Sequence, residues 1–213
     1  SILAFCERVK DLCFKWDELI ICTGTLNPIK KFEEVEFIEW EESINTNFIN
    51  QCRLVHKLLP MRSNLSPLVI FFSAGGGNCP LGFSSYNISK IGLIKFCEYL
   101  DQEIDDTRFT SIGPGWVDTP IHNQALLKLD KCSDLYKETK RRIDENDFIN
   151  IDEILKFIDW LYSQPKEIIG GRNLSIPHDI WKDEKYKDIL FSHPLSGKLR
   201  RLFNEELNGI RNI

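Results

Sequence analysis

The sequence lacks a long apolar run: no stretch approaches the roughly 18 apolar residues that a membrane span requires. An excess of basic residues is also missing, because 27 Lys and Arg stand against 32 Asp and Glu, which gives a formal net charge of −5. Without a basic field, counterion release cannot drive binding to nucleic acid. A small molecule is therefore the expected partner, and neither a membrane nor a nucleic acid is expected.

Closely spaced cysteines are missing too. The seven cysteines are odd in number and none is spaced as CxxC, so neither a disulfide framework nor a zinc site is indicated, and no metal is expected. They are typical of reduced thiols in the cytoplasm, which is the expected location. Cys22, at the end of an apolar run, is expected to face the core.

The start of the sequence lacks two further features. The chain opens at Ser1 without an initiator methionine, and Met61 is its only methionine. Nothing near Ser1 resembles the charged, apolar and small-residue layout of a signal peptide. We therefore expect the natural protein to contain sequence before Ser1.

What the sequence contains is an alternation of short apolar runs and longer amphipathic segments. Its 213 residues, 42% hydrophobic and 28% charged, are expected to form one domain over residues 1–213. The runs at 19–22 and 68–72 predict strands buried on both faces, and weaker patterns predict strands at 108–112 and 168–176. Residues 177–213 are expected to form an irregular extension.

Helices are predicted between these strands. The apolar face of the first is expected to hold Phe5, Val9 and Leu12, and Ser43 is expected to cap the start of the second. The five predicted helices cover about residues 2–15, 44–59, 84–104, 122–144 and 152–162.

Strands that alternate with helices of ten or more residues favour an α/β fold, a Rossmann-like doubly wound parallel sheet with helices on both faces. In such sheets, ligands bind at the carboxyl ends of the strands. Three of the predicted strands end in candidate binding segments, namely Thr23-Gly24, Ser73 and Pro114-Gly115. We expect these segments to meet at one edge of the sheet.

Tyr86 and Lys90 form a candidate site for proton transfer. They stand four residues apart in a predicted helix and therefore share a face. An ammonium beside a phenol favours the phenolate, so a group that ionises near pH 10 can act near neutral pH. Ser73 lies thirteen residues upstream, at the end of an apolar run.

Together with Asn47, these residues resemble the Asn, Ser, Tyr and Lys tetrad of the short-chain dehydrogenase/reductase family, which has a YxxxK core. The match falls on Asn47, Ser73, Tyr86 and Lys90, and Asn47 precedes Pro60 by thirteen residues, as is usual in that family. The segment from Pro114 to Thr119 resembles its PG-x-V-x-T motif. The resemblance covers roughly residues 10–176.

The resemblance implies an oxidoreductase that interconverts a hydroxyl and a carbonyl with NAD or NADP. Tyr86 would be the general acid or base, Lys90 would lower its pKa and hold the nicotinamide ribose, and Ser73 would hydrogen-bond the substrate oxygen. Asn47 would hold a water that links Lys90 to solvent. A homodimer or homotetramer formed through the helices of Asn47 and Tyr86 is also implied. The implied cofactor contacts are Thr23, Gly24, Tyr86, Lys90, Pro114, Gly115, Val117 and Thr119.

The sequence departs from the family in two places. The family usually shows NNAG where this chain has Ile21-Cys22-Thr23-Gly24, and no glycine-rich TGxxxGxG turn precedes Leu19. The family segment that holds the cofactor pyrophosphate is therefore expected upstream of this sequence, unless cofactor binding has been lost.

Two other functions stay open. One is a non-catalytic relative that serves as a binding or scaffolding protein, and the other is a sugar-nucleotide-modifying relative of the extended type. His122 is expected at the surface, with the alternative that it reaches the substrate from the loop after the PG segment. The basic cluster of Lys198, Arg200 and Arg201 is expected to be a solvated or subunit-contact face.

Overall fold

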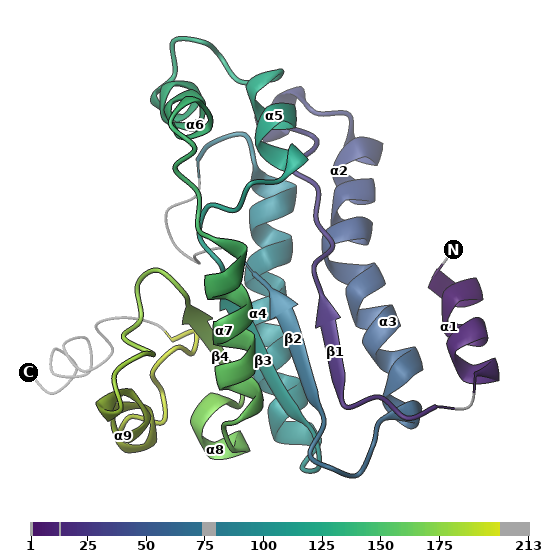
Figure 1. The fold of residues 1–213 in the computed structure, drawn as a ribbon. Helices are drawn as coiled ribbons and strands as arrows, with labels where there is room; N and C mark the ends of the chain where they lie inside the picture. Colours follow the sequence, from purple (N-terminus) through teal and green to yellow (C-terminus); the bar gives the residue numbers. More distant parts are fainter. Residues whose placement is uncertain (1, 13, 74–79, 201–213) are drawn as a thin grey trace, which may run out of the picture.

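The computed structural model describes residues 2–12, 14–73 and 80–200, and within them four parallel strands form one sheet in the order β1-β2-β3-β4 (Figure 1). Each neighbouring pair of strands is parallel, and helices cover both faces. The predicted α/β fold class is therefore confirmed. The strands are β1 (Glu18–Ile21), β2 (Leu68–Phe72), β3 (Arg108–Gly113) and β4 (Arg172–Ser175).

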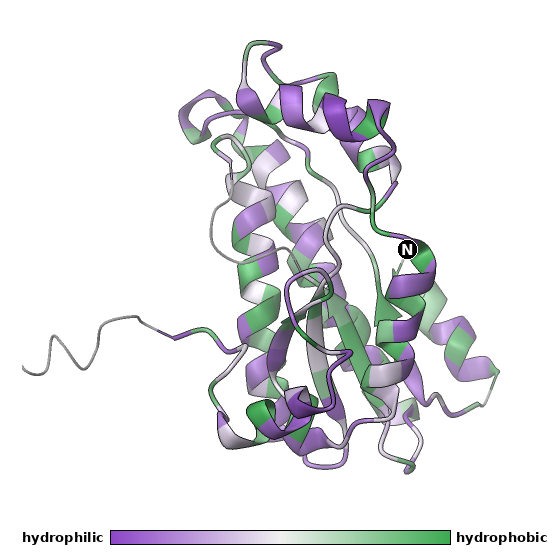
Figure 2. Cartoon of the chain, turned by 60° about the vertical axis from the view of Figure 1, so that its left-hand side comes forward, coloured by the Kyte–Doolittle hydropathy of each residue, from purple (hydrophilic) through white to green (hydrophobic). Residues whose placement is uncertain are grey.

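The two faces of β2 enter two separate hydrophobic clusters, because successive side chains of a strand point to opposite sides. Val69 and Phe71 pack with residues of α1 (Ile2–Asp11), α3 (Asn50–Leu58) and α4 (Ser84–Glu103). Leu68 and Ile70 pack against α7 (Ile151–Tyr162), α8 (Lys166–Ile169) and α9 (Lys185–Ser192). Figure 2 shows the sheet as a hydrophobic layer whose covering helices carry hydrophilic residues.

β1 lies at an edge of this sheet, so the prediction that it is buried on both faces is wrong. Ile21 is buried on the α3 side, whereas Ile20 is 39% exposed and Cys22 is exposed. On the opposite face α7 leaves β1 uncovered (Figure 1). An apolar run indicates burial on average, and it does not distinguish a central strand from an edge strand.

The first helices differ from the prediction in detail. In α1, Cys6 and Val9 are buried, while Phe5 and Leu12 are more than half exposed. The buried face of the helix is therefore rotated about the helix axis relative to the predicted apolar face. Cys13 lies outside the described residues. After η1 (Phe32–Glu34), α2 (Phe37–Ile44) continues through a π-helical turn, η2 (Asn45–Ile49), into α3 and then η3 (Leu59–Met61).

Ser43 is therefore not a helix cap. The helix starts at Phe37, with Glu36 in extended conformation before it, and Ser43 lies inside the last turn of α2 with 2% exposure. The acidic segment that precedes Ser43 forms most of α2.

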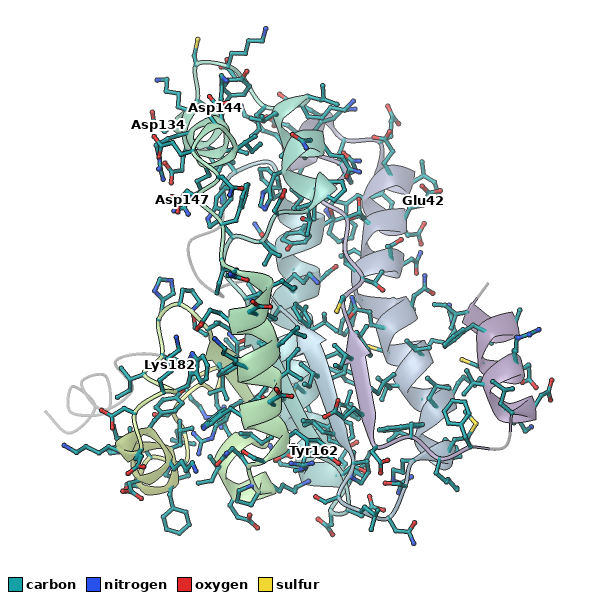
Figure 3. All side chains as sticks on the ribbon, in the orientation of Figure 1. Glu42, Asp134, Asp144, Asp147, Tyr162 and Lys182 are labelled. Atoms are coloured by element: carbon teal, nitrogen blue, oxygen red, sulfur yellow. The ribbon has the colours of Figure 1, made fainter. Side chains whose placement is uncertain are left out.

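The predicted helix at 122–144 is two helices, α5 (Pro120–Leu126) and α6 (Asp134–Asp144). Both lie beyond the carboxyl ends of the strands (Figure 1), and Figure 3 shows Asp134, Asp144 and Asp147 on α6 and after its end. The weak apolar periodicity of this polar region hid the break. Among the described residues, no helix is long and apolar enough to cross a membrane.

The C-terminal part is more regular than predicted. Residues 168–176 are divided between the end of α8, a turn at Gly170 and Gly171, and β4. Within the expected irregular extension, α9 forms, and Trp181, Tyr186 and Leu190 are buried in the core. Their spacing follows no single period, and for this reason the sequence pattern did not reveal them.

Candidate active site

Two cavities adjoin at the carboxyl ends of the strands. The first, here the lysine cavity, has a volume of about 500 Å³ and is lined by Gly24, Lys90, Val117 and Thr119 among others. The second, here the tryptophan cavity, has a volume of about 510 Å³ and is lined by Trp116. Five residues line both cavities: Ser73, Tyr86, Pro114, Gly115 and His122.

Lys90 joins the ends of two strands. The residue is 4% exposed, and its Nζ donates to the carbonyl of Phe72, the last residue of β2, at 2.7 Å and to Thr23 O, after β1, at 3.3 Å. The same Nζ lies 5.6 Å from the centre of the Tyr86 ring. An ammonium has three N–H donors, so the two carbonyls leave one for a ligand in the lysine cavity.

The charge of Lys90 has no carboxylate partner among the residues that line this cavity. Burial lowers its pKa from the ordinary 10.5 to about 8, although the neighbouring Cys22 acts in the opposite direction. At neutral pH Lys90 is therefore mainly a buried cation beside the Tyr86 ring. A cation in this position favours the ionised form of a nearby phenol.

Asn47 positions the backbone segment that follows β1. It is fully buried in the π-helical turn, where its Oδ1 accepts from Thr25 N at 2.8 Å and its Nδ2 donates to Thr25 O at 2.9 Å and to Ser43 Oγ at 3.1 Å. A methyl group added at Gly24 would lie 3.5 Å from Lys90 Nζ and 3.7 Å from Asn47 Oδ1. Asn47 itself does not line either cavity.

Gln51 also holds the segment after β1, and it was not predicted as a site residue from the sequence. Its Nε2 donates to Thr23 O at 3.0 Å and to Asn47 O at 2.9 Å, so it holds the same segment as Lys90. Thr23 contributes this carbonyl and is not among the cavity-lining residues. The spacing of four residues between Asn47 and Gln51, on one helix face, was the signal that could have identified Gln51.

Ser73 is bound to a strand two positions away in the sheet. Its Oγ lies 2.6 Å from Asn173 Oδ1, and Ser111 Oγ donates to the same Oδ1 at 3.1 Å. A hydroxyl has one proton, so in this arrangement Ser73 offers lone pairs rather than its proton to the cavities. Asn173 was not predicted, because one hundred residues separate it from Ser73.

The segment after β3 requires glycine at one position. Gly115 has a φ of +83°, and a Cβ added there would lie 3.2 Å from Pro177 Cγ. The backbone can therefore turn between the two cavities. Val117 and Thr119 follow on the lysine cavity, as expected for residues that contact a ligand there.

His122 is half-buried in an aromatic stack, so the expectation that it lies at the surface is wrong. Its ring stacks on Trp116 at 4.7 Å between centroids and lies 5.6 Å from Phe148. Nε2 lies 2.9 Å from Val117 O, a pure acceptor, so Nε2 carries the proton and Nδ1 is an acceptor. Burial lowers the pKa of His122, which keeps the ring neutral at pH 7.

Residues 1–177 match a protein-family model described as enoyl-(acyl carrier protein) reductase. An uncharacterized oxidoreductase of Saccharomyces cerevisiae is 31% identical over 110 residues, which cover 50% of this chain and 42% of the relative. A serine 3-dehydrogenase of Rhizobium radiobacter is 30% identical over 139 residues, 63% of this chain and 53% of the relative. The chain thus spans about half the length of the curated relatives that it matches.

Solved structures share the fold. A short-chain dehydrogenase/reductase of Saccharomyces cerevisiae has a TM-score of 0.68 and 22% identity, and the match covers 82% of this chain and 69% of that chain. A short-chain dehydrogenase of Escherichia coli, solved in complex with NADPH, has a TM-score of 0.66 and 17% identity, covering 82% and 68%.

Proposed function

The chain belongs to the short-chain dehydrogenase/reductase family, and from this premise we propose that it is an NAD(P)-dependent oxidoreductase that interconverts a hydroxyl and a carbonyl on a small molecule. One observation carries the proposal: Ser73 and Tyr86 lie where the two cavities adjoin, with the Lys90 ammonium 5.6 Å from the tyrosine ring. A substrate oxygen placed at this junction would meet both hydroxyls.

The lysine cavity suits the nicotinamide ribose end of the cofactor. Lys90 keeps one N–H for a ribose hydroxyl, and Gly24 leaves room beside the ammonium. The lining also includes Pro114, Gly115, Val117 and Thr119. The NADPH bound to the Escherichia coli neighbour supports a nicotinamide cofactor. When bound, that cofactor supplies or accepts the hydride. The described residues beside β1 include no glycine-rich turn for its pyrophosphate, and they do not decide between NAD and NADP.

The proposed roles of the side chains follow from their places. Tyr86 gives a proton to the substrate oxygen in reduction and removes it in oxidation, and Lys90 favours the phenolate that this exchange requires. Ser73 hydrogen-bonds the substrate oxygen once its proton turns from Asn173 Oδ1 to that oxygen. Asn47 acts indirectly, since its amide holds the Thr25 backbone and so the segment at Gly24. Proton transfer of this kind contributes about a hundred- to ten-thousandfold in rate.

The name of the Rhizobium radiobacter relative indicates serine as its substrate. We do not propose serine as the substrate of this chain. The ammonium and carboxylate of serine would require oppositely charged partners. Of the described residues that line the tryptophan cavity, none is Lys, Arg, Asp or Glu.

A homodimer or homotetramer is part of the proposal. Ile88, Ile91 and Tyr99 on α4 are exposed, and so are Phe37 and Ile38 on α2. Apolar side chains on neighbouring helices support association through this side of the molecule.

The test is cofactor binding by the full natural chain, measured by isothermal titration with NADH and NADPH. We expect one cofactor to bind, and Lys90→Met to weaken that binding by about tenfold or more, which is about 1.4 kcal/mol. Lys57→Met, at an exposed lysine of α3, is the matched control and should bind as the wild type does.

Activity then separates the catalytic from the non-catalytic alternative. Tyr86→Phe should keep cofactor binding and lose about a hundredfold or more in turnover. If neither cofactor binds at millimolar concentration, or if Tyr86→Phe leaves the biological activity unchanged, the scaffolding alternative replaces the enzyme.

A further inference from the structure

The tryptophan cavity, apart from its junction with the lysine cavity, is mainly apolar. Its walls come from four separate segments: Leu26 after β1, Phe83 before α4, Trp116 after β3, and Leu129 and Leu135 around α6. Helices α5 and α6, which lie beyond the strand ends (Figure 1), contribute Ala125 and Thr139 to its lining. Its volume of about 510 Å³ is in the range of sites for small organic ligands.

Charge is absent from the described lining of this cavity. Two cations lie behind lining rings: the Arg142 guanidinium lies over the Trp116 ring at 4.9 Å, and the Lys90 ammonium lies 5.6 Å from the Tyr86 ring. Arg142 is already paired with Glu138 at 2.7 Å and with Asp147 at 3.4 Å, so its charge is balanced outside the cavity. A charged group moved from water into such an apolar space without a partner is strongly disfavoured.

The polar side chains of the described lining belong to Ser73, Tyr86, Asn87, His122, Thr139, Ser175 and His178. At the junction, Tyr86 and Ser73 can bind one oxygen, and His122 offers Nδ1 as an acceptor because Val117 O takes the proton on Nε2. The ring of His122 is held between Trp116 and Phe148, which fixes the direction of that acceptor. Two hydroxyls thus lie at the junction, and leucine, phenylalanine and tryptophan side chains form much of the remaining lining.

We propose that the substrate is an uncharged, mainly apolar ketone, aldehyde or alcohol of about one or two rings in size, with its oxygen at Tyr86 and Ser73 and its hydrocarbon body against Leu26, Phe83, Leu129 and Leu135. The reaction rests on the proposed oxidoreductase function; the binding preference rests on the lining alone.

The experiment uses two probes of the same skeleton, acetophenone and 4-acetylbenzoate, which differ by one carboxylate. Binding to the full chain is measured by ligand-observed NMR, with and without NADPH, so that no turnover is needed. We expect acetophenone to bind about tenfold more tightly or better. Equal or tighter binding of 4-acetylbenzoate, or binding of neither probe at millimolar concentration, would overturn the proposal.

Two variants test the location. Leu129→Lys places an ammonium in the wall of the tryptophan cavity and should reduce the preference for acetophenone by about tenfold. Leu127→Lys, at a residue that is 84% exposed and does not line the cavity, should leave the preference unchanged. Equal effects of the two substitutions would place the probes elsewhere and overturn the proposal.

The experiment distinguishes failure of the oxidoreductase proposal from failure of the proposed substrate class. If acetophenone binds in the wild type and Leu129→Lys alters the preference, but NAD(P)H is never oxidised, then the oxidoreductase proposal fails and the binding preference stands. If NADPH is oxidised with 4-acetylbenzoate in preference to acetophenone, the substrate class fails and the oxidoreductase proposal stands.

Discussion

Lys90 combines two properties that usually conflict, because it is almost fully buried and it carries a charge. Among the described residues its Nζ reaches two carbonyls and no carboxylate, and burial lowers its pKa to about 8. Carbonyl dipoles compensate only part of the lost hydration of an ammonium. The residue that the proposed chemistry needs most therefore destabilises the folded chain at neutral pH.

The pH dependence of stability checks this conclusion. The folded pKa of Lys90 is lowered, so between about pH 8 and pH 10.5 the unfolded chain binds more protons at this residue and stability rises with pH. We expect the free energy of unfolding of the wild type, relative to Lys90→Met, to rise by up to about 3 kcal/mol across that range. Urea unfolding of both proteins at several pH values measures the difference. A difference that stays constant with pH would show that Lys90 is not a buried cation.

Asn173 directs the Ser73 hydroxyl. Its Oδ1 receives the protons of Ser73 and Ser111, so a substrate carbonyl must compete with Asn173 for the Ser73 proton. In Asn173→Asp the acceptor becomes an anion of nearly the same shape and should hold that proton more firmly.

We expect Asn173→Asp to lower kcat for carbonyl reduction about tenfold near neutral pH, with KM changed less, and to recover as the pH falls and the carboxyl protonates. A pH profile of kcat for the variant and the wild type measures this recovery. Asn123→Asp, at an exposed position of α5, is the control. A loss that does not depend on pH would indicate a purely structural role for Asn173.

At the scale of elements, the stack of Arg142, Trp116, His122 and Phe148 joins α5 and α6 to the strand ends. Burial, together with the Arg142 charge, lowers the pKa of His122, although the bond to Val117 O and the nearby Asp118 act in the opposite direction. Protonation would place a second cation within this stack. The two helices that cover the tryptophan cavity are therefore sensitive to acid at His122.

The direction of the lowered pKa of His122 decides how stability changes with pH. Because the folded pKa of His122 lies below 6.5, the unfolded state binds the proton more readily, and stability falls as pH falls through and below that value. We expect His122→Asn to lose part of this dependence between about pH 7 and pH 5. Hydrogen exchange of α5 and α6 in both proteins, compared at the two pH values, measures it. An identical pH response in the variant would rule out His122 as the cause.

Local sequence patterns predicted most helices and strands, but they did not predict which of these elements contact one another. The helix at Ser84–Glu103 was predicted within one residue. The same patterns could not show that β1 is an edge strand or that Ser73 meets Asn173, since both facts depend on how strands are ordered in the sheet. The tetrad was found through a motif, whereas Gln51, Ser111 and Asn173 belong to no motif.

At the scale of the whole molecule, a C-terminal arm at residues 195–200 closes the sheet at β4. Gly197 O accepts from Asn173 N at 2.7 Å, and Arg172 donates to the carbonyls of Leu190, His193 and Ser196. A side chain at Gly197 would come within 2.9 Å of Asn173 O, and its φ is +70°. The arm thus covers an edge that would otherwise offer unpaired backbone groups to other chains.

Glu98 on α4 fixes the end of this arm. It is 1% exposed, its Oε1 accepts from Leu199 N at 2.6 Å, and its Oε2 accepts from Arg200 at 2.8 Å and from Lys95 at 2.7 Å. Burial alone would raise the pKa of this carboxyl, but these hydrogen bonds together hold it below the usual 4.5. Arg200, expected to be solvated or to contact another subunit, is exposed and also donates to Glu98, and Arg201 lies outside the described residues.

We therefore expect the neutral variant Glu98→Gln to release the arm. It keeps the shape of the side chain but weakens the charge-assisted bonds, and we expect a loss of about 1–3 kcal/mol in the free energy of unfolding. The amide of Asn173 should then exchange its hydrogen faster, because Gly197 O no longer covers it. Glu103→Gln, at an exposed glutamate of the same helix, should change neither quantity. If Glu98→Gln lowers stability without faster exchange at Asn173, then Glu98 stabilises α4 and the closure of β4 depends on Arg172 instead.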